Sequence, residues 1–240
     1  MCGRYASSRN PEDLIEEFEI EVAPPMKLAP NWNTAPTQSI YVIAELLKKR
    51  TLLIARWGLI PSWATDLSMG ARTVNARMES VAEKPSYRAA FKTRRCLIPA
   101  DGYYEWYQGR VSGSLKAVPK QPFYLHRKDG RSLAMAGLYE YWRNPVTDEV
   151  LTSATIITTS SQGALSQIHD RMPVLLPEDR YRAWLDSEER AKAELLELLQ
   201  VQEMDQDLVA EPVSRLVNSV RNNGSGLIRP VPLELETPLI

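Results

Sequence analysis

The stretch Met1-Cys2-Gly3-Arg4-Tyr5 opens the chain, and the later motifs are interpreted outward from it. Because small residues at position 2 permit removal of the initiator Met, the mature chain is expected to begin with Cys2. A terminal Cys carries an α-amine with a pKa of about 7.7–8.0 and a thiol with a pKa of about 8.5, so both are partly reactive at neutral pH. An aldehyde can form an imine with the amine, and the thiol can then close a thiazolidine ring. The alternative is an ordinary Cys at a frayed terminus, and this stretch alone does not decide between the two.

The composition is that of a globular chain of 240 residues, with 44% hydrophobic and 25% charged side chains. The net charge of −1 argues against a general nucleic-acid binder. The charge is segregated, however. Residues 68–95 carry seven basic and two acidic side chains (+7 − 2 = +5), and residues 186–212 carry two basic and nine acidic ones (2 − 9 = −7). Such patches would steer a polyanion onto one face, or they are simply solvated surfaces.

Several classes of protein are excluded by what the sequence lacks. Two cysteines, Cys2 and Cys96, do not make a disulfide framework, and Cys96 is predicted to lie in a core strand. We find no signal peptide and no apolar run long enough for a membrane span, so a reducing, cytoplasmic location is expected. Two distant His and the absence of C-x-x-C, P-loop and G-x-G-x-x-G motifs predict neither a metal site nor a cofactor.

Local signals predict short strands with a few helices. Asn10-Pro11-Glu12-Asp13 is typical of a helix start, with Asn as the cap and Pro at the first helical position. Ile40–Leu46 and Thr51–Trp57 are predicted as antiparallel strands around a hairpin tip at Lys48-Lys49-Arg50. Further strands are predicted at 95–99, 103–107, 122–126, 132–138, 150–158 and, at an edge, 213–220; helical pieces are predicted at 79–82 and 86–91 and after Pro177 and Ser187.

The organisation along the chain is simple. Residues 108–120 are rich in Gly, Ser and Lys and predict a flexible loop. We find no internal repeat and no convincing linker. The sequence therefore predicts one domain over residues 1–240, with a core of about 2–220 and a C-terminal tail at 221–240.

Two polar positions stand out between apolar neighbours. Glu105 lies between Tyr104 and Trp106 on a predicted strand. If it points inward, desolvation raises its pKa and prepares it for acid/base chemistry; if it points outward, it is an ordinary surface Glu. His169 lies beside Asp170 in a polar turn, where an imidazole titrates near neutrality and can move protons.

The segment Trp57-Gly58-Leu59-Ile60-Pro61-Ser62-Trp63 places two Trp residues around a Gly and a Pro. Buried packing is the favoured interpretation for Trp57. For Ile60, Pro61 and Trp63 the functional alternative is an exposed apolar wedge against unstacked bases.

Taken together, the motifs resemble the SOS-response-associated peptidase (SRAP) family. They occur in the expected order and are Cys2-Gly3-Arg4-Tyr5, Asn33-Thr34-Ala35-Pro36, Trp57-Gly58-Leu59-Ile60-Pro61, Asn75-Ala76-Arg77, Pro99-Ala100-Asp101-Gly102-Tyr103-Tyr104-Glu105-Trp106 and His169-Asp170-Arg171-Met172-Pro173. The resemblance implies an α+β fold: a single domain with a mostly antiparallel, β-rich, barrel-like core, peripheral helices and one active site at the mature N-terminus. It also implies recognition of abasic sites in single-stranded DNA and a covalent thiazolidine cross-link in the DNA damage response.

The resemblance assigns catalytic roles to four residues. Cys2 would be the covalent nucleophile, and Asn75 would orient the terminal amine or the sugar. Glu105 would act as general acid and base while the abasic sugar opens to its aldehyde. His169 would move protons at the sugar hydroxyls during imine formation and ring closure.

The resemblance also implies a path for the DNA. Arg4, Arg77 and Arg171 would hold flanking phosphates. Asn33, Pro36 and the loop with Ile60, Pro61 and Trp63 would shape the path. The region 108–120 is longer than the loop usual in this family.

The expected partner is single-stranded DNA with abasic sites, and no membrane. We expect a monomeric, bacterial-type, cytoplasmic protein that is associated with the nucleoid when bound to DNA. Autoproteolytic release of Met1 and a lyase side activity are compatible with this function. Two other functions stay open: an N-terminal-nucleophile cysteine peptidase or amidase acting on other substrates, and a non-covalent reader of modified DNA.

Overall fold

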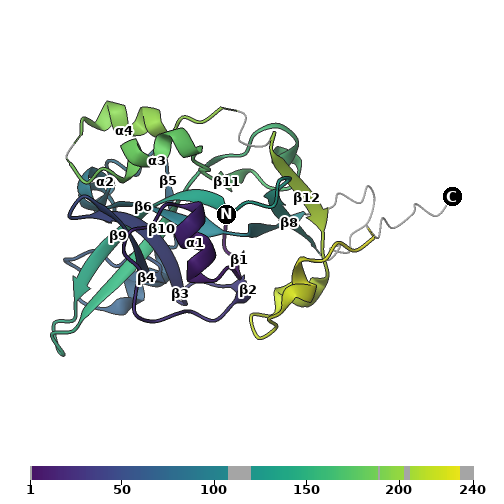
Figure 1. Ribbon diagram of the computed structural model, residues 1–240, viewed down its shortest axis with the longest axis horizontal. Helices are drawn as coiled ribbons and strands as arrows, with labels where there is room; N and C mark the ends of the chain where they lie inside the picture. Colours follow the sequence, from purple (N-terminus) through teal and green to yellow (C-terminus); the bar gives the residue numbers. More distant parts are fainter. Residues whose placement is uncertain (1, 108–119, 189, 203–205, 233–240) are drawn as a thin grey trace, which may run out of the picture.

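The computed structural model describes residues 2–107, 120–188, 190–202 and 206–232. Two β-sheets occupy its centre, one mixed and one antiparallel (Figure 1). The strands are β1 (Tyr5–Ser7), β2 (Asn31–Thr34), β3 (Ser39–Leu46), β4 (Lys49–Trp57), β5 (Asn75–Arg77), β6 (Arg95–Ala100), β7 (Gly102–Tyr107), β8 (Gln121–Arg127), β9 (Leu133–Arg143), β10 (Val150–Ser160), β11 (Arg171–Pro173) and β12 (Leu208–Pro212). The helices are α1 (Pro11–Glu17), α2 (Arg88–Thr93), α3 (Glu178–Leu185) and α4 (Lys192–Leu199), with 3₁₀ segments η1 (Leu67–Arg72), η2 (Gly163–Gln167), η3 (Arg215–Asn218) and η4 (Ser225–Ile228).

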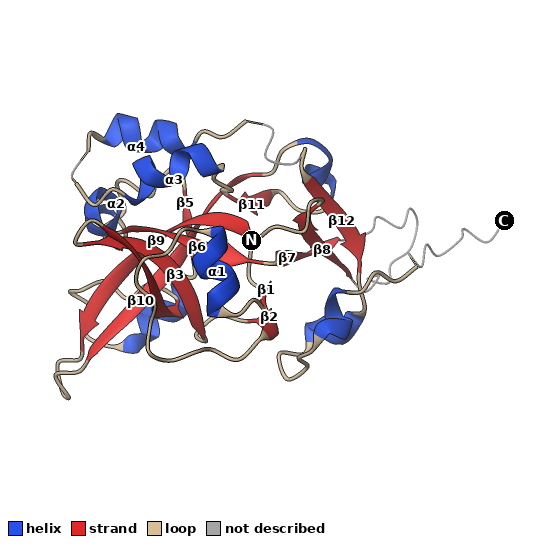
Figure 2. Ribbon diagram, viewed as in Figure 1, coloured by secondary structure: helices blue, strands red, loops and turns tan. Residues whose placement is uncertain are grey.

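The larger sheet closes on itself. Its strands run in the order β11-β10-β4-β3-β6-β9, and β9 pairs back onto β10 from Val150↔Arg143 to Ile156↔Gly137. Most pairs are antiparallel, but β4 and β5 both lie parallel to β10. The predicted α+β fold with a barrel-like, mostly antiparallel core and peripheral helices is confirmed. Helices α2, α3 and α4 gather on one side of this barrel (Figure 2).

The sequence predicts the structure well where residues that are close in the chain set the conformation. The Asn10 side chain accepts a hydrogen bond from the Asp13 N–H at 2.9 Å and caps α1. β3 and β4 form the predicted hairpin, but its tip is Leu47-Lys48, one residue earlier than predicted, because Leu46 pairs with Lys49. Both tip residues have positive φ, 51° and 63°, as a tight hairpin turn requires.

The second sheet runs in the order β12-β8-β7-β1-β2. Within it, β1 lies between β7 and β2, with Tyr5 opposite Tyr103 on one side and Thr34 on the other. The N–H of Tyr104 also donates to the Arg4 carbonyl at 2.9 Å. This pairing fixes the first residues of the chain alongside the start of β7.

Two predicted elements are wrong. Residues 213–220 form no edge strand; they contain η3, and the edge of the second sheet is β12, paired with β8. Val213 and Val217 are instead buried in a small core with Tyr104 and Tyr124, and the 3₁₀ turn of η3 carries Val217 into it. Residues 79–82 form turns rather than a helix. The predicted loop at 108–120, apart from residue 120, and the end of the tail beyond residue 232 lie outside the described residues, as does Met1.

In the part of the chain that the structure describes, one cationic side chain, that of Arg95, is buried in the core. Arg95 donates to the carbonyls of Trp184 at 2.9 Å, Phe91 at 3.1 Å and Glu188 at 3.2 Å, and to those of Lys92 and Asp186. These are carbonyls at the ends of α2 and α3, so the guanidinium joins both helices to β6. Trp57 is buried, as predicted, and Cys2 and Cys96 are both buried free thiols. Among the described residues we find no helix long and apolar enough to cross a membrane.

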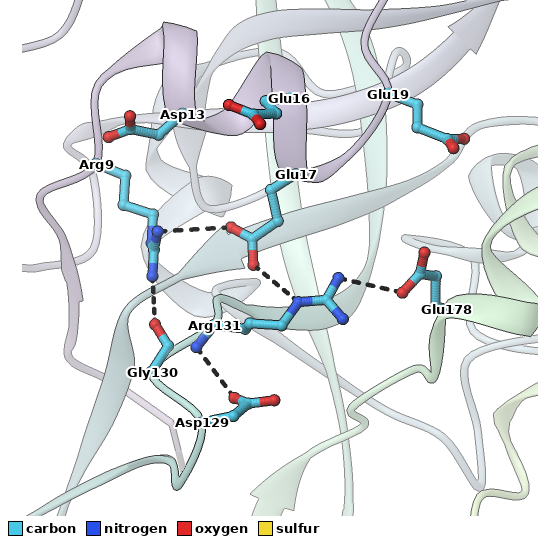
Figure 3. Close-up of a pocket in the computed structure, with 9 residues that line it drawn as sticks. All are labelled: Arg9, Asp13, Glu16, Glu17, Glu19, Asp129, Gly130, Arg131 and Glu178. Carbon is cyan, nitrogen blue, oxygen red and sulfur yellow. Dashed lines mark hydrogen bonds and ion pairs between the residues drawn. The ribbon is translucent and has the colours of Figure 1, made fainter.

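A hollow of about 500 Å³ lies between α1 and the turn that joins β8 to β9 (Figure 3). Glu17 is at its centre and accepts hydrogen bonds from the N–H and hydroxyl of Ser132 at 2.7 and 2.6 Å. Its carboxylate also lies 3.9 Å from Arg9 Nη1 and 3.7 Å from Arg131 Nε. The charges of this hollow therefore serve to hold α1 against the sheet.

Candidate active site

Strand β10 brings together segments that are far apart in the sequence. Its C-terminal half pairs in parallel with β5, with Ile156 opposite Asn75. Its last residues pair antiparallel with β11, with Ser160 opposite Arg171. The turn that holds His169 therefore lies at the same end of β10 as the end of β5, and the candidate site forms there against the start of the chain.

Cys2 is buried at this position. The Asn75 side chain donates from Nδ2 to the Cys2 carbonyl at 2.8 Å, which fixes the backbone that carries the candidate nucleophile. The other polar atom of the amide, Asn75 Oδ1, is buried and has no hydrogen-bond partner among the described residues. Burial, and next to it the charge of Glu105, raises the pKa of the Cys2 thiol, so the thiol is held in its protonated form.

Glu105 points inward, the first of the two alternatives drawn from the sequence. Along β7 the side chain of Tyr104 enters the small core with Tyr124, and Glu105 is on the opposite face with only 3% of its surface exposed. Burial raises the pKa of Glu105 from 4.5 to about 7. At neutral pH this carboxyl can both donate and accept a proton, which is the property of a general acid and base.

His169 faces Glu105. Its Nε2 lies 3.8 Å from Glu105 Oε2, and its side chain is 28% exposed. The Arg171 N–H donates to Nδ1 at 3.0 Å, which turns Nε2 toward Glu105. Burial lowers the pKa of His169, against the opposing charge of Asp170, whose Oδ1 lies 2.8 Å from Nδ1.

The three arginines predicted to contact DNA differ in their exposure and in their hydrogen bonds to other protein groups. Arg77 is exposed at the end of β5. Arg4 is half-buried, with Nη1 donating to Asn33 Oδ1 at 2.7 Å and to the Val217 carbonyl at 2.8 Å. Arg171 forms a bidentate pair with Glu79, a residue that sequence reasoning did not select. The two residues are 92 positions apart, so no local pattern connects them.

Asn33 and Pro36 enter the structure in different ways. Asn33 is buried, and its Nδ2 donates to the carbonyls of Ser219 and Asn222, both at 2.9 Å. It therefore holds the segment after η3 against β2 rather than presenting its amide to solvent. Pro36 lies in the turn between β2 and β3 and is partly exposed.

The loop between β4 and β5 corrects one prediction. Ile60 and Pro61 are buried, so neither is part of an exposed wedge, whereas Trp63 is 58% exposed. The loop is closed at its base, where the backbone of Gly58 packs against that of Gly70. Gly58 has a φ of 117°, and a Cβ at this position would lie only 2.2 Å from the Gly70 carbonyl oxygen. The Ile60 N–H then donates to Ser153 Oγ at 2.8 Å on the barrel surface.

The donors gathered here suit proton transfer and covalent chemistry. Within the residues described, no group of three or more His, Cys, Asp or Glu side chains is placed to hold a metal ion. The site brings together a buried thiol, a carboxyl that titrates near neutrality, an imidazole and a carboxamide.

Comparison with known proteins places this arrangement in a family. The family described as SOS response associated peptidase (SRAP) matches residues 1–220. The abasic site processing protein YoqW of Bacillus subtilis (strain 168) is 40% identical over 229 residues, which cover 95% of this chain and 99% of that protein. The abasic site processing protein HMCES of Xenopus tropicalis is 32% identical over 265 residues, covering 93% and 76% of the two chains.

Solved structures agree at the level of the fold. A crystal structure from Bacteroides thetaiotaomicron superposes with a TM-score of 0.79 at 24% identity, over 96% of this chain and 100% of that one. A second, from Bordetella bronchiseptica, gives a TM-score of 0.72 at 26% identity, over 89% and 100%. With the match over residues 1–220, the chain belongs to the SOS response associated peptidase (SRAP) family.

Proposed function

We propose that this protein processes abasic sites in single-stranded DNA by forming a thiazolidine between Cys2, freed of Met1, and the aldehyde of the ring-opened sugar. The observation that carries the proposal is the position of Glu105, buried, with a pKa of about 7, beside Cys2 and 3.8 Å from His169 Nε2. The names of the relatives in Bacillus and Xenopus, which process abasic sites, support the choice of substrate.

The covalent step balances without a redox partner. The Cys2 amine adds to the aldehyde carbon, and loss of one water gives an imine. Loss of water with a proton from Glu105 leaves this imine protonated on nitrogen. The thiol sulfur then adds to the imine carbon while the thiol proton passes to Glu105, which closes the ring. Because the thiol is kept protonated by burial, the amine is the first nucleophile and the sulfur reacts only once an electrophilic imine is beside it.

The surrounding side chains have defined tasks in this scheme. Glu105 donates a proton to the departing water and, once ionised, accepts the proton of the thiol. His169 presents Nε2 toward the sugar hydroxyls, and Asn75 holds the Cys2 carbonyl while its buried Oδ1 accepts from the amine or the sugar. Holding amine and thiol beside a bound aldehyde makes the reaction effectively unimolecular, worth up to about 7–11 kcal/mol when aligned.

The DNA path is proposed over the exposed groups at the end of β5 and the loop before it. Arg77 is exposed and would contact a flanking phosphate, and Trp63 offers a stacking surface for an adjacent base. Arg4 and Arg171 already bind protein acceptors and would contact phosphates through their remaining N–H groups.

Two activities follow from the same site. Release of Met1, by the chain itself or by a separate aminopeptidase, must precede the cross-link, because a peptide nitrogen cannot form the imine. If the DNA strand is eliminated from the imine before the sulfur closes the ring, the product is a cut strand, which is a lyase reaction.

The test is a denaturing gel of the purified protein with single-stranded DNA that carries one abasic site. We expect a slowly migrating covalent band with wild type, its loss in Cys2→Ala, and a normal band in Cys96→Ala, which removes the other buried thiol. Absence of a band with chain shown to begin at Cys2 contradicts the proposal. Turnover of peptide substrates in the absence of DNA would instead favour the amidase function, and DNA affinity without any covalent product would favour the reader.

A further inference from the structure

Glu79 and Arg171 form a two-point ion pair at the rim of the candidate site. Arg171 Nη1 donates to Glu79 Oε1 at 2.6 Å, and Arg171 Nη2 donates to Glu79 Oε2 at 3.0 Å. The Arg171 side chain is only 13% exposed, whereas that of Glu79 is 49% exposed. Because planar, bidentate pairs fix orientation as well as charge, the Arg171 side chain has one defined position.

The pair spans the end of β10. The carbonyl of Thr158 accepts from Arg171 Nη2 at 2.6 Å and also from the Met78 N–H at 2.9 Å, directly after β5. Arg171 starts β11 on one side of β10, and Glu79 follows β5, which pairs with β10 at Thr158. The ion pair therefore ties the end of β5 to the start of β11 across β10.

This tie acts on two groups of the site. β5 begins with Asn75, which holds the Cys2 carbonyl. The backbone N–H of Arg171 donates to His169 Nδ1 at 3.0 Å, which orients the ring toward Glu105. A change in the position of Arg171 would thus turn His169, whose Nε2 is the nitrogen 3.8 Å from Glu105.

We propose that Glu79 is a positioning residue for the reaction: its bidentate pair with Arg171 fixes His169 over Glu105 and Asn75 over Cys2. The inference rests on the proposed function for its kinetic test but not for its spectroscopic one. It differs from a role of Glu79 as an internal mimic of phosphate, which DNA would displace from Arg171. That role predicts tighter DNA binding and an unchanged rate when Glu79 is removed.

The kinetic test compares two variants at Glu79. Glu79→Gln removes the charge, and Glu79→Asp keeps the charge but is one methylene too short for the bidentate geometry. At saturating abasic DNA we expect both to lower the cross-linking rate constant about tenfold, because misplacement of reacting groups is costly. DNA that carries a non-reactive tetrahydrofuran analogue of the abasic site should bind both variants at least as tightly as it binds wild type, as measured by the dissociation constant.

Glu83→Gln is the matched control. Glu83 follows in the same turn region, is 71% exposed and pairs with Lys192 at 2.7 Å. Its substitution changes the net charge of the basic segment by the same amount as Glu79→Gln. We expect it to leave the rate constant at saturating DNA within about twofold of wild type.

The spectroscopic test uses the two histidines of the chain, His126 and His169. The ring signals of His169, followed by NMR without DNA, should shift in both Glu79 variants, while those of His126, bound to Glu211 at 3.1 Å, stay in place. Around His169 the ionisable groups Glu105, Asp170 and Lys120 are unchanged by these substitutions, and its neighbour Arg171 is also retained.

Three outcomes overturn the inference: a normal rate in both variants, a loss in Glu79→Gln that Glu79→Asp restores, or weaker DNA binding with a normal rate at saturation. If wild type forms no cross-link at all, the proposed function fails instead. The His169 signals then decide on Glu79 alone, and unshifted signals in both variants overturn its positioning role.

Discussion

Glu17 at the α1 hollow and Glu105 at the candidate site are two carboxylates in different environments. The comparison shows how the environment makes one a structural group and the other a group suited to acid–base chemistry. Glu17 accepts two hydrogen bonds from Ser132 and faces the guanidinium groups of Arg9 and Arg131. Glu105 is buried beside a thiol and an imidazole, and burial raises its pKa to about 7. The carboxylate at the α1 hollow thus supports the fold through its partners, whereas the one on β7 has the environment of an acid–base group.

The largest expected effect separates the two carboxylates by activity. Glu105→Gln should lower the rate of cross-linking about 100-fold or more, because a general acid and base contributes about 10²–10⁴-fold. Glu17→Gln should leave the rate within about twofold at a temperature where the variant is folded. Initial rates on denaturing gels measure both, and equal losses in the two variants would remove the distinction between the two regions.

The second prediction concerns stability against pH. Because the pKa of Glu105 is raised in the folded protein, its protonated form is favoured there, and stability is lost as pH rises from about 4.5 through about 7. This pKa shift corresponds to about 3 kcal/mol of free energy of unfolding. Between pH 5 and pH 8 the stability of Glu105→Gln should therefore rise by about 2–3 kcal/mol relative to that of wild type. Glu17→Gln should be destabilised by about 1–3 kcal/mol, since its hydrogen bonds are lost.

Chemical denaturation of the three proteins at both pH values measures this. The quantity to compare is the change in free energy of unfolding between pH 5 and pH 8, which cancels any pH-independent effect of the Gln side chain. If the free energy of unfolding changes with pH in the same way in wild type and in Glu105→Gln, the pKa of Glu105 is not raised in the folded protein.

The smallest predicted effect compares two arginines. Arg77→Gln should weaken non-covalent binding of single-stranded DNA about 3–10-fold and reduce the slope of log affinity against log salt by about 0.7, as expected for one lost phosphate contact. Arg131→Gln, at the α1 hollow, should change neither the affinity for DNA nor its salt dependence. A salt titration by fluorescence anisotropy measures both slopes, and equal slopes in Arg77→Gln and wild type would take Arg77 out of the DNA path.

How much could be predicted from the sequence depended on the range of the interaction. The Asn10 cap and the β3–β4 hairpin are specified by neighbouring residues, and both were predicted within one residue. The edge strand at 213–220 was wrong, because Val217 and Asn33 meet across 184 positions and this contact overrides local strand propensity. Long-range packing of this kind has no local signature.

The candidate site followed the same rule. The sequence singles out Glu105 because it lies between two aromatic residues, and His169 because it lies beside Asp170 in a polar turn. The structure brings Glu105 Oε2 and His169 Nε2 to 3.8 Å from each other. Burial of Ile60 could not be foreseen, since it depends on the close approach of Gly58 to Gly70. Glu79 was read only as a charge in a basic segment, and its pairing with Arg171 exists only once β5 and β11 flank β10.

The most direct measurement is the intact mass of the product formed with a single-stranded oligonucleotide carrying one abasic site. If a free aminothiol at the start of the chain condenses with the sugar aldehyde, the mass equals the chain without Met1 plus the oligonucleotide minus one water, with no borohydride needed to preserve it. An adduct that retains Met1, or that survives only after reduction, would contradict ring closure at Cys2.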